Sequence, residues 1–270
     1  MGRGTVDAKT IFITGGASGI GRAVAHYFGA RGWFVGLADV NEAGMDETAA
    51  GIPGGMSATY RLDVTDREQW KDAITDFSEK TGGRMDVLFN NAGIGIGGPI
   101  QEMSDHDIDR TIAINFTGVV NGIRAAFELL RDTPDSCILN TSSAAGIYGA
   151  SGLVVYSGTK FAVRALTEGL EGELAPYGIR SRALMPSFID TPLLDGPVTG
   201  RNSSTRDVVQ EAGLEITPVS EVAEAAWEAV NGKRIHTTVG KTAKRLAFAA
   251  RWMPGRLRRS ARGLANDSAQ

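Results

Sequence analysis

Cysteine is nearly absent from this chain of 270 residues, which contains a single one, Cys137. One cysteine excludes an internal disulfide and is typical of proteins in a reducing compartment. Because Cys137 lies in an apolar run, we expect it to be a small, buried core residue. A chain of this length buries enough apolar surface to fold without a disulfide or a structural metal.

Histidine and long apolar runs are also scarce. The three histidines, His26, His106 and His236, are isolated, and no His/Cys/Asp cluster has metal-ligand spacing, so we expect no metal site. No apolar run is long enough for a membrane-spanning helix, and the first residues lack the pattern of a secretory signal. Gly2 invites N-myristoylation, but Val6 stands where that motif requires Ser or Thr. We therefore expect a cytoplasmic protein.

Short β-branched runs alternate with amphipathic segments along most of the chain. This alternation predicts an α/β fold, with a doubly wound parallel sheet of about seven strands and helices on both faces. The candidate strands are Thr10–Thr14, Trp33–Ala38, Thr59–Asp63, Val87–Asn90, Cys137–Thr141, Ile179–Met185 and, more weakly, Ile235–Val239. The clearest helical candidates are Ile20–Arg31, Asp105–Arg131 and Ser157–Ala175.

A glycine-rich segment follows the first candidate strand and opens a helix. It reads Thr14-Gly15-Gly16-Ala17-Ser18-Gly19-Ile20-Gly21. Glycines permit a tight turn and a close approach of backbone N–H groups to a pyrophosphate, and the positive end of the next helix attracts the same anion. We therefore predict a dinucleotide phosphate site formed by Gly15, Ser18, Gly19, Ile20 and Gly21.

Asp39 ends the second candidate strand, eighteen residues after Gly21. A carboxylate at this point hydrogen-bonds the ribose hydroxyls of adenosine and repels a 2′-phosphate, which favours NAD over NADP. The alternative is an aspartate that only caps a turn. Arg22 lies just inside the helix, and we expect it to face solvent.

Tyr156 and Lys160 are four residues apart at the start of a helical pattern, so they share one face of the helix. A nearby ammonium and an oxidised nicotinamide favour the phenolate, and lowering the pKa of Tyr156 by about 2–3 units would suit acid/base work near neutral pH. Such a pair is common by chance on helix surfaces. Ser143 stands thirteen residues before Tyr156, and its hydroxyl would hydrogen-bond a substrate oxygen on which charge develops.

These segments together resemble the short-chain dehydrogenase/reductase family over roughly residues 8–195. The glycine loop has the family's T-G-x-x-x-G-x-G pattern, and the segment Asn140–Gly146 looks like its serine segment, with spacing that selects Ser143 rather than Ser142. The resemblance implies a Rossmann fold. It also implies a catalytic set of Asn115, Ser143, Tyr156 and Lys160, in which Asn115 holds a water in a proton relay.

The resemblance further implies the remaining cofactor contacts, from the adenine to the nicotinamide carboxamide. Besides the glycine loop they are Asp39, Asp63, Val64, Asn91, Ala92, Gly93, Tyr156, Lys160, Pro186, Ile189 and Thr191. Ser187 departs from the family, which usually has a glycine at this position, and serine does not freely adopt a positive φ.

The activity implied by the resemblance is NAD-dependent interconversion of a secondary alcohol and a ketone. Ser143 would polarise the carbonyl, Tyr156 would exchange the hydroxyl proton, and Lys160 would orient the nicotinamide ribose. A dinucleotide-binding sensor or scaffold on the same fold is the alternative, and a dehalogenase-like or dehydratase-like reaction is a third. The complete set of four catalytic residues favours the enzyme. The resemblance also implies that the helices within 105–131 and 157–175 pair with their copies across a two-fold axis, giving a homodimer or homotetramer.

Residues 193–218 occupy the place where this family varies its substrate lid. The segment combines a polar stretch with Leu193, Leu194, Val208 and Val209, which indicates a fairly bulky apolar substrate. We predict that residues 1–240 form a single dinucleotide-binding and catalytic domain.

Charge is distributed unevenly between this domain and residues 241–270, a predicted basic amphipathic extension. Residues 1–232 carry 18 Lys and Arg against 30 Asp and Glu, and residues 233–270 carry 10 against 1. Within the extension, Leu246, Ala250, Met253 and Leu257 fall on one helical stripe, beside Phe248 and Trp252. The extension is interpreted as a helix docked on the core, as a peripheral contact with an anionic membrane, or as a contact with an acidic partner. Nucleic acid is not an expected partner, because the rest of the chain is acidic.

Overall fold

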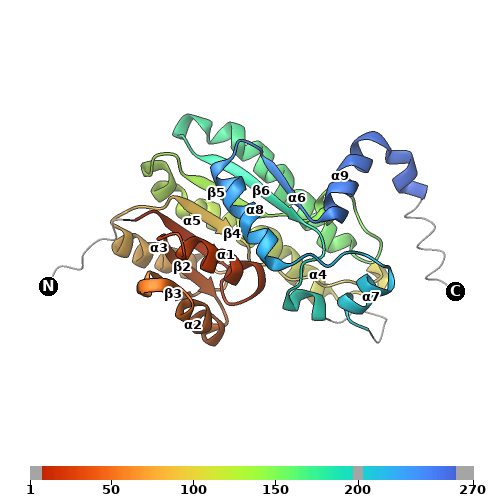
Figure 1. The fold of residues 1–270 in the computed structure, drawn as a ribbon, viewed down its shortest axis with the longest axis horizontal. Helices are drawn as coiled ribbons and strands as arrows, with labels where there is room; N and C mark the ends of the chain where they lie inside the picture. Colours follow the sequence, from red (N-terminus) through yellow and green to blue (C-terminus); the bar gives the residue numbers. More distant parts are fainter. Residues whose placement is uncertain (1–7, 197–202, 260–270) are drawn as a thin grey trace.

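The computed structural model describes residues 8–196 and 203–259, and the strands in these residues form one parallel sheet (Figure 1). The strand order is β3-β2-β1-β4-β5-β6-β7, which confirms the predicted doubly wound parallel sheet. The strands are β1 (Thr10–Thr14), β2 (Phe34–Asp39), β3 (Ser57–Arg61), β4 (Val87–Asn90), β5 (Cys137–Thr141), β6 (Arg180–Pro186) and β7 (His236–Val239).

The predicted bounds are confirmed for β1, β4 and β5 and differ by one or two residues for the others. β3 ends at Arg61, so Asp63 lies two residues beyond the strand rather than at its end. The reason is a local turn, in which the Asp63 carboxylate accepts hydrogen bonds from the backbone N–H of Thr65 at 2.9 Å and from its hydroxyl at 2.8 Å.

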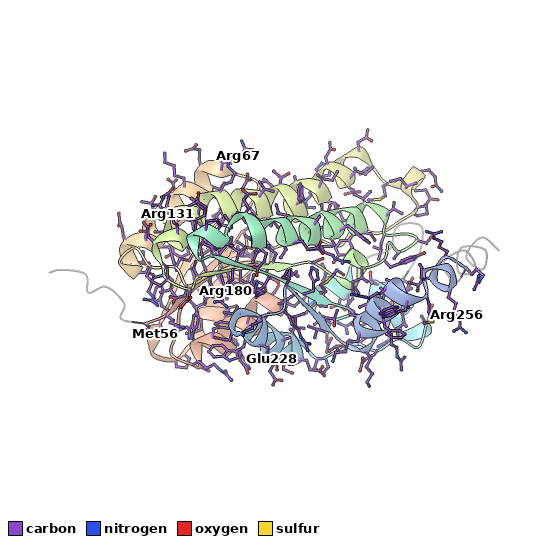
Figure 2. The ribbon with its side chains drawn as sticks, turned by 90° about the horizontal axis from the view of Figure 1, so that it is seen from above. Met56, Arg67, Arg131, Arg180, Glu228 and Arg256 are labelled. Carbon is purple, nitrogen blue, oxygen red and sulfur yellow. The ribbon has the colours of Figure 1, made fainter. Side chains whose placement is uncertain are left out.

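Helices cover both faces of the sheet, and Figure 2 shows this three-layer arrangement from above. One face carries α1 (Gly19–Gly29), α2 (Glu42–Ala50) and α8 (Val219–Asn231), and the other carries α3 (Arg67–Thr81), α5 (Gly118–Asp132) and α6 (Val154–Glu173). Side chains of β1 alternate between the two cores: Ile11 and Ile13 join the cluster under α1, whereas Phe12 joins the cluster under α3. Burial on both faces explains why these strands are apolar throughout.

The predicted long helix 105–131 is divided by a wider turn. It consists of α4 (Asp105–Ile112), a π-helical turn over Ala113–Thr117, and α5. Single π turns insert a residue into a helix and often occur at functional sites. Here the turn contains Asn115, which is fully buried.

Helix α6 carries both buried and exposed apolar residues along its length. Leu170 is buried in the chain's own core, as is Ile123 of α5, whereas Phe161 remains 40 % exposed. Phe127 of α5 packs edge-on against Tyr177. Phe161 is thus the apolar residue of this set best placed for a subunit contact. The homodimer stays a prediction, which light scattering at micromolar concentration tests.

The C-terminal part of the described chain includes α7 (Thr205–Glu211), β7 and α9 (Lys241–Trp252). Leu246, Ala247 and Ala250 of α9 pack against Ile147, Ala183 and Met185. Met253 follows the helix, and residues 254–259 resume a helical conformation from Pro254. Within residues 8–196 and 203–259, no helix is both long and apolar enough to cross a membrane.

Candidate active site

A cleft of about 450 Å³ lies at the carboxyl ends of β1 to β6. This volume is in the range of small-molecule sites, and the carboxyl edge is where open parallel sheets bind ligands. All but two of the predicted site residues line it: Gly15, Ser18, Gly19, Ile20, Asp39, Asp63, Val64, Asn91, Ala92, Gly93, Ser143, Tyr156, Lys160, Pro186, Ile189 and Thr191. The two predicted residues that do not line the cleft are Gly21 and Asn115.

The glycine loop is shaped by close backbone contacts. Gly15 has φ +69°, and a Cβ there would lie 2.9 Å from the Asn91 side-chain nitrogen. A Cβ on Gly21 would lie only 2.0 Å from the carbonyl oxygen of Gly15, so Gly21 packs the start of α1 against the loop rather than facing the cleft. This glycine cradle beside the N-terminus of α1 fits a dinucleotide pyrophosphate.

The Asp39 carboxylate lines the cleft and also orders the backbone around it. It accepts hydrogen bonds from the backbone N–H of Ala17 at 3.1 Å and of Asn41 at 3.0 Å. The turn-capping role and the position for ribose recognition therefore belong to the same side chain.

The place of Arg22 in the sequence suggests that it faces solvent, but its side chain is held by neighbouring groups. Its guanidinium donates to the carbonyl of Ala17 at 2.6 Å and to the Thr48 hydroxyl at 3.0 Å, and it pairs with Glu47 at 2.9 Å. These contacts join the glycine loop and α1 to α2.

Thr14 is a structural site residue that the sequence reasoning did not single out. Its hydroxyl accepts hydrogen bonds from the backbone N–H of Asn91 at 3.0 Å and of Ala92 at 3.1 Å. The Asn91 side-chain amide in turn donates to the Thr14 carbonyl at 3.1 Å. The end of β1 is thus fixed to the segment after β4. The cleft lining further includes Ile94, Arg110 and Ile114, which the sequence also did not indicate.

Tyr156 lies in the first turn of α6, with Lys160 one turn later, and Ser143 stands two residues after the end of β5. The Tyr156 hydroxyl lies close enough to the Ser143 hydroxyl for an interaction that favours the phenolate. The Lys160 ammonium lies 5.6 Å from the centre of the Tyr156 ring and donates to the backbone carbonyl of Thr141 at 2.9 Å. The predicted tyrosine, lysine and serine are therefore brought together at one wall of the cleft.

Burial dominates the ionisation of this group. Burial raises the pKa of Tyr156, and the interaction with Ser143 opposes this shift only in part. Burial lowers the pKa of Lys160 to about 8. The expected lowering of the Tyr156 pKa is therefore wrong for the chain alone, because desolvation of the phenolate outweighs its neighbours. Both groups are driven toward their neutral forms.

Asn115 contacts the site from behind the cleft wall. Its side-chain oxygen accepts from the backbone N–H of Ile94 at 2.8 Å, and its side-chain nitrogen donates to the Ile94 carbonyl at 2.9 Å. A Cβ on Gly93 would lie 3.2 Å from this oxygen and 3.5 Å from the Lys160 nitrogen. Asn115 thus fixes the segment after β4 close to Lys160, and its part in a proton relay stays a prediction.

Ser187 requires no positive φ, since Asp135 is the one non-glycine residue with a positive φ in the described part of the chain. The Ser187 hydroxyl donates to the carbonyl of Val239 at 3.2 Å. Space for it comes from Gly240, at φ +86° and ψ 154°, where a Cβ would lie 2.3 Å from the Ser187 hydroxyl oxygen. Only glycine adopts such a conformation readily. The serine is therefore accommodated by the glycine after β7.

Ion pairs tie helix α7 of the lid region to the segment that follows β6. Arg206 of α7 pairs with Asp190 at 2.7 Å and with Asp195 at 2.6 Å. Leu193 and Leu194 line the cleft as expected, whereas Val209 is buried and neither Val208 nor Val209 is among the lining residues. Residues 197–202 of the predicted lid lie outside the described residues. Among the described residues, no three His, Cys, Asp or Glu side chains converge as metal ligands would.

Comparison with known proteins places these features in context. The family model described as short chain dehydrogenase matches residues 9–200. Cyclopentanol dehydrogenase of Comamonas testosteroni is 36% identical over 204 residues, which are 73% of this chain and 81% of that protein. Meso-2,3-butanediol dehydrogenase of Serratia marcescens is 35% identical over 190 residues, 70% of this chain and 75% of that protein. A short chain dehydrogenase/reductase from Burkholderia phymatum, solved in complex with NAD, aligns with TM-score 0.82 and 27% identity, covering 94% of this chain and 95% of that one.

The contact between Ser187 and Gly240 yields a first prediction. Gly240→Ala should lower the free energy of unfolding by about 2 kcal/mol or more, because it adds both backbone strain and a clash. In a Ser187→Gly background the cost should shrink, with a coupling energy of about 0.5–3 kcal/mol. Urea unfolding of the four proteins measures this. Gly178→Ala is the matched control, since Gly178 has φ +72° and open space around its Cβ position. Additive costs at 187 and 240 would contradict the interpretation.

The burial of Lys160 yields a second prediction. Its pKa is about 8 in the folded protein, against an ordinary value of 10.5. Between these pH values the unfolded chain binds more protons, so the free energy of unfolding should rise with pH, by up to about 3 kcal/mol in total. Lys160→Met removes this rise, so its stability relative to the parent should be highest below pH 8 and should fall toward pH 10.5. Urea unfolding at both pH values tests it, with the exposed Lys233→Met as control. A pH-independent difference between parent and Lys160→Met would contradict it.

Proposed function

Because this chain belongs to the short-chain dehydrogenase/reductase family of oxidoreductases, we propose that it interconverts a secondary alcohol and a ketone with NAD as cofactor. The observation that carries the proposal is the meeting of the Tyr156 and Ser143 hydroxyls beside Lys160 at the cleft wall. NAD, when bound, supplies or accepts the hydride.

Tyr156 moves the proton of the substrate hydroxyl. Burial keeps Tyr156 protonated near neutral pH, which is the form needed to donate a proton to a ketone oxygen during reduction. Ser143 donates to the same oxygen as negative charge develops on it. In the oxidative direction the phenolate must form, and the Lys160 ammonium, close to the ring, favours it. Lys160 is held in this place by the Thr141 carbonyl.

The preference for NAD rests on Asp39. Its carboxylate lies at the cleft, at the end of β2, where it would accept hydrogen bonds from the adenosine ribose hydroxyls. The glycine loop would hold the pyrophosphate, and Pro186, Ile189 and Thr191 would hold the nicotinamide end. Arg22 does not compensate for Asp39, because its guanidinium is engaged by Ala17, Thr48 and Glu47.

We propose a fairly bulky apolar alcohol or ketone as substrate. Ile94, Leu193 and Leu194 contribute apolar surface to the cleft. One of the relatives named above is called cyclopentanol dehydrogenase, and cyclopentanol is a cyclic secondary alcohol. A panel of alcohols and ketones of increasing size, followed by NADH absorbance, tests this class. The location we propose is cytoplasmic, supported by the single buried Cys137, and cell fractionation tests it.

Replacement of the proton donor tests the reaction. Tyr156→Phe should fold and bind NADH but lose turnover by about 10²–10⁴-fold, because the general acid is removed while the cleft is kept. Steady-state kinetics and NADH fluorescence titration measure the two effects. Tyr177→Phe, a half-exposed tyrosine after the far end of α6, is the matched control. Near-parental turnover by Tyr156→Phe would refute the mechanism, and a parent protein that binds NADH but turns over no substrate would favour the sensor.

Removal of one charge tests the cofactor choice. The parent should bind NADH more tightly than NADPH, and Asp39→Asn should reduce this preference roughly tenfold or more, because it removes repulsion of the 2′-phosphate. Asparagine keeps one of the two hydrogen-bond acceptors that the turn uses. Dissociation constants for both cofactors measure the preference, and Asp46→Asn on the exposed face of α2 controls for loss of a carboxylate. Tighter binding of NADPH by the parent would overturn the assignment.

A further inference from the structure

Helix α9 presents two faces of different chemistry. Ala243 is fully buried, and Leu246, Ala247 and Ala250 pack against Ile147, Ala183 and Met185. At about 100° per residue these four alanine and leucine positions fall within one side of the helix. That side is the attachment of α9 to the protein.

The opposite face carries two exposed aromatic residues. Phe248 is 59% exposed and Trp252 is 64% exposed, and they lie one helical turn apart. The same helical spacing places Lys244, Arg245 and Arg251 on either side of them, and all three are exposed. The Arg251 guanidinium lies 5.3 Å from the centre of the Trp252 ring. We call Lys244, Arg245, Phe248, Arg251 and Trp252 the α9 face.

Positive charge continues beyond α9. Residues 241–259 contain seven Lys and Arg and no Asp or Glu. Lys241 is paired with Glu215 of the lid at 3.1 Å, whereas Arg256, Arg258 and Arg259 are exposed in the helical turn that follows Pro254. Figures 1 and 2 show α9 and Arg256 at one end of the molecule, where they project away from the sheet.

We propose that the α9 face binds the surface of an anionic lipid bilayer. Exposed Phe and Trp between Lys and Arg are the composition of helices that lie in the interface, with aromatic rings among the lipid headgroups and cations at the phosphates. The docked side of α9 holds the helix rigidly in the protein, so binding requires no folding step. Charge complementarity identifies the occupant as an anionic surface.

A second copy of this chain fits the α9 face less well. A two-fold interface would set this surface against itself and bring like charges together. The surface is also a convex helix flanked by charge rather than a groove that would receive a partner's side chains. Self-association therefore becomes an outcome of the test.

Membrane docking would place the cleft near the bilayer. Gly240, immediately before α9, lies directly beside Ser187 of the cleft lining, and α9 packs on the turn Ala144–Gly146 that follows Ser143. The docking itself does not depend on the proposed reaction, so a failure of either proposal leaves the other standing.

Co-sedimentation with lipid vesicles tests the proposal. The full chain is mixed with vesicles of phosphatidylcholine alone or of phosphatidylcholine with phosphatidylserine, at low and moderate salt. We expect binding to the anionic vesicles alone, and a marked loss of binding as salt screens the charges. Lys244→Glu with Arg251→Glu should weaken binding by about tenfold or more, because each cation near the surface contributes about fivefold.

Matched variants separate the α9 face from general electrostatics. Lys233→Glu with Arg234→Glu makes the same change in net charge at two exposed residues before β7, and binding should change by less than about twofold. Phe248→Ala with Trp252→Ala should also weaken binding and should abolish the blue shift of tryptophan fluorescence on adding anionic vesicles. Circular dichroism of each variant confirms the fold.

Three results would overturn the proposal. One is the absence of binding to anionic vesicles at low salt by the folded parent protein. Another is an equal loss of binding in the control variant Lys233→Glu with Arg234→Glu, which would show that general charge attraction, and not the α9 face, holds the protein on the vesicle. The last is that the variants of the α9 face change oligomerisation, measured by analytical ultracentrifugation, instead of vesicle binding. This result would assign the surface to a second copy.

Discussion

The parallel alignment of β1, β4 and β5 is the constraint on which the site depends, because it brings the ends of three separate segments to one edge. Alignment alone leaves the backbone groups beyond each strand unpaired, and polar side chains satisfy them. The Thr14 hydroxyl accepts from two backbone N–H groups after β4, and the Thr141 hydroxyl donates to the Asn91 side chain at 3.2 Å. Asn115 then holds Ile94, two residues after Ala92, through both of its backbone groups. The glycine loop, the segment after β4 and the serine segment are therefore fixed as one unit, on which Tyr156 and Lys160 close from α6.

Burial within this unit explains the unusual electrostatics of the reacting group. Lys160 is 4% exposed and donates to one carbonyl, which compensates only part of the lost hydration of its ammonium. Tyr156 shows the complementary effect, since desolvation disfavours its phenolate. The two groups are close enough for the charge of one to stabilise the opposite charge of the other. In the chain alone both groups are therefore driven toward their neutral forms, and the charged form of either is favoured only when an opposite charge lies close to it.

The sequence predicted the sheet, the glycine loop and the pair of Tyr156 and Lys160 because those features have local signals, whereas the other cofactor contacts came from the family resemblance. Gly15 to Gly21 form one contiguous loop, and Tyr156 and Lys160 are one helical turn apart, so spacing alone placed them together. Contacts between distant segments had no such signal. The role of Thr14 arises from a backbone 77 residues away, and that of Asn115 from the loop 21 residues before it. The pKa direction of Tyr156 was missed for a related reason, because burial is a property of the packed fold, whereas the neighbouring lysine is visible in the sequence.

The contact between Ser187 and Gly240 also links the edge of the sheet that lines the cleft to helix α9. Ser187 adds a hydroxyl where the resemblance led us to expect glycine, and the chain meets it with Gly240 at the point where β7 ends and α9 begins. The conformation of Gly240 sets the direction in which α9 leaves the sheet, and the packing of Leu246 against the Ile147 cluster fixes it there. The same geometry necessarily turns Phe248 and Trp252 outward, because residues two positions apart lie on different sides of a helix. The exposed aromatic residues of the α9 face are thus a consequence of how the core holds α9. Their apolar surface stays in contact with water, which is unfavourable for the free protein.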